Sequence, residues 1–253
     1  MNKIRKYFIL LSIILIFLLL HFKHYTTIGQ MAFNRSFKNN VIYIEEKSKQ
    51  GEGYTPYYVV DNNYNGKTLL LRKEILKDYK QMNGKNNDYT ANYDGCDIDI
   101  FLNEDFYNNI DLNDRNKIIE STIDVTDEKY LYTWKFDSKE IKRKVFLLSL
   151  YEVTSSYRKY NVYTNEGKHL LFFLNPFHRK LNDSWWLRTP HTGYGTQFFY
   201  TDGGYAFDFC EGSTKRGIRP AFCLNNNQSV YKVGNHYFLE PVSEETSKNV
   251  ADN

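Results

Sequence analysis

Apolar residues alternate with polar ones, or run continuously over a few positions, along much of the chain. Residues 54–72, YTPYYVVDNNYNGKTLLLR, form two such segments around Asn65-Gly66. An Asn-Gly pair favours a two-residue β-hairpin turn, because both turn positions need a positive φ. In the last third, WWLR, TQFFYTDGGYAFDFC and RGIRPAFCL predict further strands, the second of them a hairpin through Asp202-Gly203-Gly204. The pattern therefore predicts a chain rich in strands.

Helical spacing is confined to short segments. The apolar residues of 97–106 share one helical face, and Asp97 can cap the first turn; they are Ile98, Phe101, Leu102 and Phe106. A second short helix is expected near 113–120, and the apolar run at 144–153 predicts a buried strand that leads into a short helix. The charged segment 126–144 lacks periodicity and is interpreted as a surface excursion. Together with the strands, these segments predict an α+β fold.

The most hydrophobic segment lies near the N-terminus. Residues 7–22, YFILLSIILIFLLLHF, follow a basic cluster of Lys3, Arg5 and Lys6. The run is longer than a typical signal-peptide core and shorter than a full membrane span. We interpret it as an uncleaved signal anchor, with a cleaved signal peptide as the alternative. In either case the basic cluster stays in the cytoplasm and the body of the chain lies outside, at the cell membrane or secreted.

This interpretation divides the chain into four parts. They are a signal anchor or transmembrane helix at residues 1–23, a tether at 24–40, one domain at 41–240 and a polar flexible tail at 241–253. A domain of this length can bury a substantial core.

The positive net charge comes from the N-terminal segment. The chain carries +3, and Lys3, Arg5, Lys6 and Lys23 supply four positive charges, which leaves −1 (3 − 4) for the remainder. A near-neutral body provides no basic stripe for phosphates, so we expect no nucleic-acid partner.

The cysteines and carboxylates do not predict a metal or cofactor. Cys96, Cys210 and Cys223 form no C-x-x-C pair, so buried free thiols are expected, with a disulfide between Cys210 and Cys223 as the alternative. Asp61 begins a partial match to a calcium loop, but Arg72 stands where a glutamate ligand is required. Asp94, Asp97 and Asp99 are better explained by helix capping and the helix dipole than by metal binding or acid–base chemistry.

Six motifs follow one another in a familiar order. They are YYVVDNNYNGKTLLLR, DIDIFLNEDFYNN, VFLLSLYEV, WWLRTP, a glycine-containing aromatic hairpin and GIRPAFCL. In this order they resemble a widespread bacterial domain of unknown function with paired WLRSP and GVRPA signatures. Thr189 replaces the serine and Ile218 the valine. The resemblance covers roughly residues 40–225.

That family is similar to the C-type-lectin-like group, which includes the fold of the formylglycine-generating enzyme. The resemblance implies a central twisted antiparallel sheet with flanking helices, and no activity. We interpret the motif residues as structural; they are Trp185, Trp186, Arg188, Pro190, Gly217, Arg219 and Pro220.

The arginines and tryptophans of these motifs carry specific expectations. Arg188 and Arg219 should be buried braces that pair with acids among Asp97, Asp99, Glu152 and Asp208. Because side chains alternate along a strand, Trp185 and Trp186 should face opposite ways, one into the core and the other onto a helix or into solvent. Pro220 predicts an edge strand or a bulge.

Enzymes of the same fold group need features that match poorly here. The formylglycine-generating branch uses a reactive cysteine pair, whereas Cys210 and Cys223 lie among bulky apolar neighbours. Iron-dependent branches need a histidine cluster, whereas the histidines are scattered; they are His169, His178, His191 and His236. FLNPF and LNDSWW match the elements of calcium-binding lectins only in part.

We therefore expect a non-catalytic, membrane-tethered module that binds a protein or glycan at the cell surface. The aromatic residues of the C-terminal hairpin region are the candidates for ligand contact; they are Tyr194, Phe198, Tyr200 and Tyr205. A degenerate formylglycine-generating-type or iron-dependent enzyme is the first alternative. A surface scaffold subunit, with an extended apolar patch near 126–144, is the second.

Overall fold

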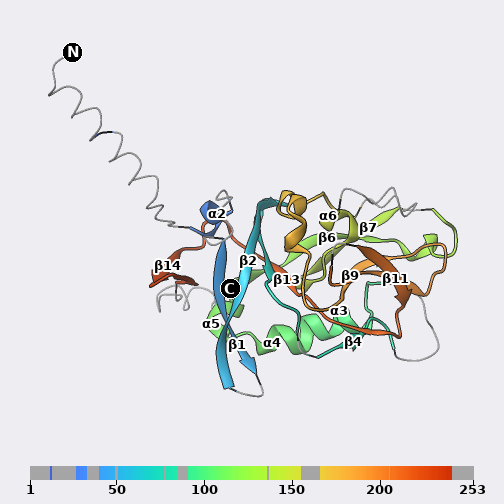
Figure 1. Ribbon diagram of the computed structural model, residues 1–253, viewed down its shortest axis with the longest axis horizontal. Helices are drawn as coiled ribbons and strands as arrows, with labels where there is room; N and C mark the ends of the chain where they lie inside the picture. The colour runs from blue at the N-terminus through green and yellow to red at the C-terminus, as the bar shows by residue number, and fades with distance from the viewer. Residues whose placement is uncertain are drawn as a thin grey trace, which may run out of the picture.

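The computed structural model describes most of the chain between residues 27 and 240 (Figure 1). The described residues are 12, 27–32, 40–48, 51–76, 78–84, 91–135, 137–154, 166–204 and 206–240. The expected tail at 241–253 lies outside them, as does the hydrophobic run 7–22 apart from Ser12. Among the described residues, no helix is long and apolar enough to cross a membrane.

A large sheet forms the centre of the fold. Its strands lie in the order β14-β15-β1-β2-β3-β13-β5, and β8 also pairs with β13. Their bounds are β1 Val41–Ser48, β2 Gly51–Tyr64, β3 Lys67–Arg72, β5 Ile118–Ile119, β8 Val145–Phe146, β13 Ala221–Leu224, β14 Val230–Val233 and β15 His236–Leu239. Every described pairing in this sheet is antiparallel except that of β1 with β15. The architecture is that of an α+β protein dominated by strands.

The predicted hairpin at 54–72 is confirmed. β2 and β3 pair on either side of Asn65 and Gly66, whose φ angles of 51° and 79° both lie in the left-handed region. Leu69, Leu70 and Leu71 are all buried, because β3 lies between β2 and β13 with both faces covered.

A smaller sheet carries the aromatic motifs. Its order is β11-β10-β9, with β9 at Trp185–Pro190, β10 at Gln197–Thr201 and β11 at Phe207–Glu211. The predicted aromatic hairpin is therefore confirmed as β10–β11. Trp185 and Trp186 bond different neighbours, since their indole nitrogens donate to the carbonyls of Arg179 and Lys80. Both rings are fully buried, so the expectation that one might meet solvent is wrong.

The strand predicted at 216–224 is divided. Lys215–Arg216 form β12, which pairs with β4 at Lys80–Gln81, while β13 begins only after Pro220. Pro220 lacks an amide hydrogen, but its carbonyl accepts the Arg72 amide of β3 at 2.9 Å. β13 is a central strand between β3 and β5, so the expected edge is not found. Cys210 on β11 and Cys223 on β13 lie in different sheets, and the three cysteines are free thiols.

One continuous helical segment spans residues 97–109. It consists of α3 at Asp97–Phe101, a π-helical turn η2 at Leu102–Phe106 and α4 at Tyr107–Asn109. The predicted face is buried at Ile98, Leu102 and Phe106. Cys96, not Asp97, occupies the N-cap position, and Asp97 lies in the first turn. The other described helices are short: α2 Ile28–Met31, α5 Leu112–Arg115, η3 Glu128–Tyr130, α6 Leu150–Val153, η5 Leu171–Leu174 and η6 Pro176–His178.

Part of the expected tether belongs to the folded body. Thr27 forms a β-bridge with Ser229, and the amide of Ile28 donates to the Gln228 carbonyl at 2.8 Å. Ile28 and Met31 of α2 are fully buried. Residues 27–31, which were expected to be tether, are therefore packed on the folded body, because two apolar side chains suffice to dock one helical turn.

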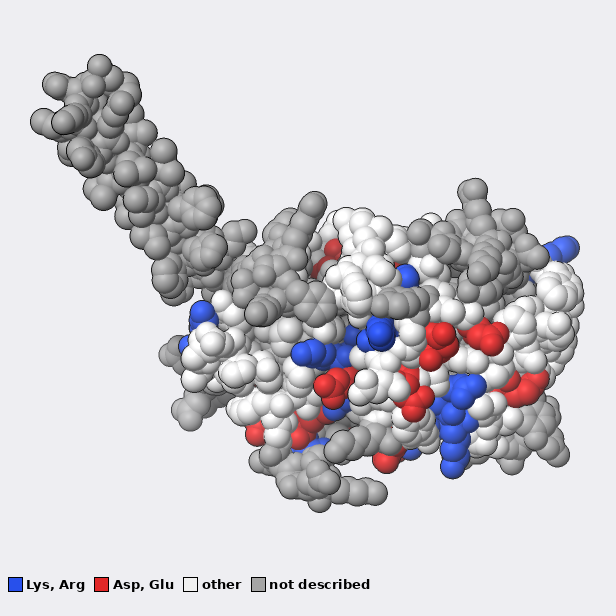
Figure 2. Space-filling model, viewed as in Figure 1, with Lys and Arg blue, Asp and Glu red and all other residues white. Residues whose placement is uncertain are grey.

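The segment 126–144 contains a hairpin rather than an irregular loop. β6 at Ser121–Thr126 pairs with β7 at Ser138–Arg143 over six residue pairs. The residues of β7 are half-buried or exposed, so its sequence lacks the apolar alternation that would have predicted a strand. Charges of both signs are interspersed on the face of the molecule seen in Figure 2.

Candidate functional site

Three exposed aromatic side chains gather where the β6–β7 hairpin meets the β9–β10 loop. Tyr132 and Trp134 are each 58% exposed and Tyr194 is 50% exposed. The two segments touch directly, since the Tyr132 amide donates to the Thr192 carbonyl at 2.6 Å. The Trp134 and Tyr194 ring centroids are 5.9 Å apart. We call Tyr132, Trp134 and Tyr194 the aromatic platform.

Two glycines of the loop HTGYGT make room for the platform. A Cβ added to Gly193 would lie 2.4 Å from an atom of the Trp134 ring, and one added to Gly195 would lie 2.2 Å from the Tyr132 ring. The rings therefore rest against bare backbone, and any larger residue at either position would displace them. Their other sides remain in water, as the exposed fractions of both rings indicate.

The hairpin backbone is strained at the two platform residues that it contributes. Tyr132 has a φ of 66° and Trp134 a φ of 58°, in the left-handed region that L-residues other than glycine avoid. This conformation costs about 1–2 kcal/mol for each residue. Strain of this kind persists where surrounding contacts impose it, and it occurs preferentially at functional sites.

His191 supports the platform from below. Its ring lies 5.6 Å from Trp134 and 4.7 Å from Tyr194, and it also packs on Phe199 and Phe209. Burial lowers the pKa of His191, so the ring is neutral at physiological pH and behaves as part of an apolar foundation.

The predicted ligand-contact residues have different environments. Tyr194 belongs to the platform, whereas Phe198 is fully buried and cannot contact a ligand. Tyr200 is half-buried beneath the Arg216 guanidinium, which lies 4.3 Å from its ring centroid. Tyr205 lies outside the described residues. Tyr132 and Trp134 were missed because their segment is charged and aperiodic, although the paired glycines around Tyr194 signalled a close approach by another group.

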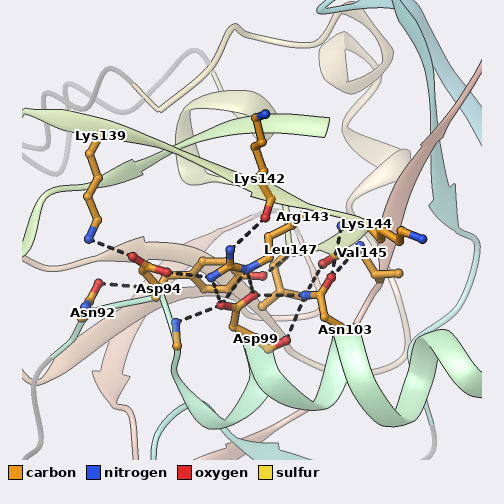
Figure 3. A network of polar contacts seen from close by, with 12 residues as sticks. Asn92, Asp94, Asp99, Asn103, Lys139, Lys142, Arg143, Lys144, Val145 and Leu147 are labelled. Carbon is orange, nitrogen blue, oxygen red and sulfur yellow. Dashed lines mark hydrogen bonds and ion pairs between the residues drawn. The ribbon is translucent and has the colours of Figure 1, made fainter. Parts of the chain in front are cut away.

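The acidic cluster near α3 is a set of ion pairs (Figure 3). Arg143 Nη2 lies 2.6 Å from Asp94 Oδ1 and 2.7 Å from Asp99 Oδ2, and Lys139 Nζ lies 2.9 Å from Asp94 Oδ2. The hydrogen bonds that Arg143 donates to the Asp99 carboxylate raise the pKa of the Arg143 guanidinium. Asp97 instead accepts the Gly84 amide. Cations thus neutralise two of these carboxylates, and the described residues contain no group of three or more His, Cys, Asp or Glu that could hold a metal.

The thiols are poorly suited to act as nucleophiles. Burial raises the pKa of Cys96 and of Cys223 to about 12, and burial also raises that of the half-buried Cys210. A reactive cysteine needs the opposite shift, because the thiolate is the attacking species.

The two motif arginines are buried, as predicted. Arg188 makes a two-pronged contact with Glu152, at 2.7 Å and 3.0 Å, so one of the four candidate acids is its partner. Arg219 forms no ion pair within the described part of the chain. Its guanidinium donates to the carbonyls of Arg72, Lys73 and His178 and packs on the Trp185 ring.

Comparison with known proteins identifies one family. No curated protein and no solved structure matches the chain. A family profile matches residues 65–226, which include the whole aromatic platform, all of β3 to β13 and the motif arginines. This match begins later in the chain than the resemblance expected from about residue 40. The chain belongs to the family described as a domain of unknown function, DUF6273.

Proposed function

We propose that the protein is a non-catalytic module, tethered to the membrane and facing outward, that binds a glycan on the aromatic platform. The observation that carries the proposal is the exposure of three rings on a preformed and strained backbone. One face of a sugar ring presents C–H groups, which stack on an aromatic ring while the hydroxyl groups remain hydrated. Because the rings are already held in place, little conformational entropy is lost when a ligand binds.

The size of the platform favours a glycan over a protein ligand. An aromatic side chain has about 150–250 Å² to bury, so three half-exposed rings offer roughly 300–400 Å². A stable protein interface needs about 800 Å² from each partner. The platform therefore suits a ligand of a few sugar units, and the neighbouring exposed residues Thr133 and Lys135 offer polar groups to its hydroxyls.

Binding can be tested with the full chain in detergent micelles, first on a glycan array and then by calorimetry with the oligosaccharide that binds best. We expect Trp134→Ala and Tyr194→Ala each to weaken binding about tenfold, since one stacked ring contributes about 1–1.5 kcal/mol. Tyr54→Ala is the matched control, because Tyr54 is similarly exposed but lies on β2.

Tryptophan fluorescence gives a second readout. Trp134 is exposed whereas Trp185 and Trp186 are buried, so acrylamide quenching reports mainly on Trp134, and a bound glycan should protect it. Binding that is unchanged in both platform variants, or the absence of any bound glycan, would contradict the proposal.

The membrane tether is supported by residues 7–22 and the preceding basic cluster. The expected result is that the full chain stays with membranes after an alkaline wash, and that mass spectrometry finds the hydrophobic run in the mature protein. Loss of the hydrophobic run from the mature protein would instead indicate a cleaved signal peptide and a secreted protein.

We also propose that the domain has the C-type-lectin-like fold. The central antiparallel sheet with short flanking helices supports this assignment, as do the WWLRTP and GIRPA motifs at β9 and before β13. A crystal structure of residues 27–240 tests it, and superposition on a different fold group would rule it out.

A further inference from the structure

Three apolar side chains project from the segment that holds η5 and η6. Leu171 is 76% exposed, Leu174 65% and Phe177 64%, the highest values among the large hydrophobic residues that the structure describes. We call these three residues the apolar tip. Exposed apolar side chains of this size usually mark a contact with a partner or a membrane.

The tip is held in place by its inner side. His178 Nδ1 donates to the Phe172 carbonyl at 2.5 Å, and the His178 ring stacks on the Phe172 ring with centroids 3.7 Å apart. Arg219 donates to the His178 carbonyl at 2.8 Å, which joins the segment to the core. Phe173 is buried. Packing and hydrogen bonds on the inner side of the segment therefore hold the three apolar side chains in their outward positions.

The tip segment packs along β2, from Tyr58, whose ring centroid lies 5.2 Å from that of Phe172, toward the end of the strand that contacts α2. The Asn62 side chain of β2 donates to the Gly29 carbonyl of α2, and the next residue, Asn63, accepts from Lys168 Nζ at 2.5 Å. Lys168 lies three residues before Leu171, the first residue of η5. Figure 1 shows α2 and the gold segment that holds η5 on the two sides of this end of β2.

The sequence places a bilayer close to this end. The hydrophobic run ends at Phe22, and five peptide steps lead to Thr27, where the packed structure begins. Even fully extended, they reach only about 17 Å. The tip segment carries no carboxylate of its own, since no Asp or Glu occurs from residue 167 to 182. Lys168, near its start, is paired with Asp61 at 2.8 Å, so the local charge there is balanced rather than positive.

We propose that the apolar tip inserts into the lipid interface beside the hydrophobic run, so that the domain contacts the membrane at two places. The inference rests on the proposed tether and is independent of the glycan ligand. An exposed apolar turn without carboxylates has the chemistry of an interfacial anchor, with its apolar side chains at the boundary between headgroups and acyl chains. Two contacts fix the orientation of the domain on the membrane, which a single contact cannot do.

The test uses the full chain in vesicles of phosphatidylcholine and phosphatidylglycerol. A fluorescent label sensitive to polarity is attached at Phe177→Cys, in a chain that also carries Cys210→Ser because Cys210 is the only cysteine that is not buried. Leu112→Cys is the matched control. Leu112 is also exposed, but it lies far from α2. Its helix α5 packs beside Glu45, which pairs with Tyr54 on β2, roughly 25 Å along that strand from Asn62.

We expect the label at residue 177 to emit at a shorter wavelength in vesicles than in buffer. Lipids that carry a nitroxide near the headgroup should reduce its emission intensity by roughly twofold or more, because interfacial side chains lie about 5–10 Å deep. The label at 112 should show neither change. Co-flotation with the vesicles but no quenching at 177 overturns the tip proposal and leaves the tether intact. A chain that does not float refutes the tether as well. A blue shift at residue 177 without quenching by the nitroxide lipids overturns the tip proposal, because it indicates that protein rather than lipid covers the tip.

A triple variant tests the proposal without a label. Leu171→Ser, Leu174→Ser and Phe177→Ser together should leave the thermal melting temperature in detergent unchanged, since all three side chains are exposed. In vesicles, they should increase the access of an aqueous protease to the connection at residues 23–26. Protection equal to that of the native chain would overturn the proposal.

Discussion

Arg188 and Arg219 are both fully buried, yet their charges are balanced in different ways. Burial alone would lower the pKa of Arg188, but Glu152 raises it. Burial lowers the pKa of Arg219 to about 9, because its contacts are carbonyl oxygens and ring faces rather than a carboxylate. The sequence identified both as buried braces, but it could not show which one would lack a carboxylate, since the acids that approach them come from distant segments.

Arg219→Ala is expected to lower stability. The variant leaves three carbonyl oxygens without their donor, which costs more than is regained by no longer burying a cation. We expect a loss of about 2 kcal/mol in the free energy of unfolding, or roughly 4–8 °C in Tm for a domain of this size. Differential scanning calorimetry measures it, and Lys215→Ala removes an exposed cation from the same segment as a control. An unchanged Tm would show that Arg219 is not a brace.

At the scale of elements, the sequence predicted hairpins, whose two strands are neighbours in the chain, but not the pairings between distant segments. The Asn65-Gly66 hairpin and the β10–β11 hairpin each contain both partners and a turn signal. By contrast, β15 pairs with β1, and α2 docks beside Ser229. The partners are far apart in the sequence, so no local pattern predicts either pairing. Alternation along β10 also misled the choice of Phe198, because β10 is the middle strand of its sheet and Phe198 and Phe199 are both buried.

The η5–η6 segment should loosen in acid. Burial lowers the pKa of His178 to about 4, from an ordinary value of 6.5. The unfolded chain therefore takes up this proton more readily than the folded one, so the contribution of His178 to stability is complete above pH 6.5 and is lost as the pH falls toward 4. Arg219 lies against the same residue and opposes its protonation.

Hydrogen exchange at the amides of His178 and Arg179 measures this loosening, after correction for the intrinsic pH dependence. Both amides close η6 through the carbonyls of Asn175 and Pro176. His178→Phe keeps a ring that can stack on Phe172 but cannot titrate, so its exchange should show no such step. An equal step in both proteins would assign the loosening to another group, such as His169, whose pKa burial also lowers.

At the scale of the whole molecule, the family segment and the folded unit do not coincide. Residues 65–226 omit β1, β2, β14 and β15. β2 covers one edge of β3, and its residues Tyr57 and Val59 are fully buried. The segment that the family profile matches therefore does not enclose a complete core.

A fragment of residues 65–226 is accordingly expected not to fold alone. Removing β2 exposes the edge of the central strand β3 together with Leu69, Leu70 and Leu71. A fragment of residues 27–240 retains every described strand and should melt cooperatively. Circular dichroism during heating distinguishes them, and a cooperative transition in the shorter fragment would contradict the prediction.

The parallel pairing of β1 with β15 also constrains the order of folding. Ile42 lies opposite Tyr237, so the first strand of the sheet is completed by one of the last residues of the domain to be synthesised. A chain that enters the membrane by its N-terminus would carry β1 with an open edge until nearly the whole domain had crossed. Contacts between such distant residues slow folding, because a long loop must close before they are made. If the domain is exported as proposed, the open edge of β1 is the surface that would need shielding until β15 has crossed.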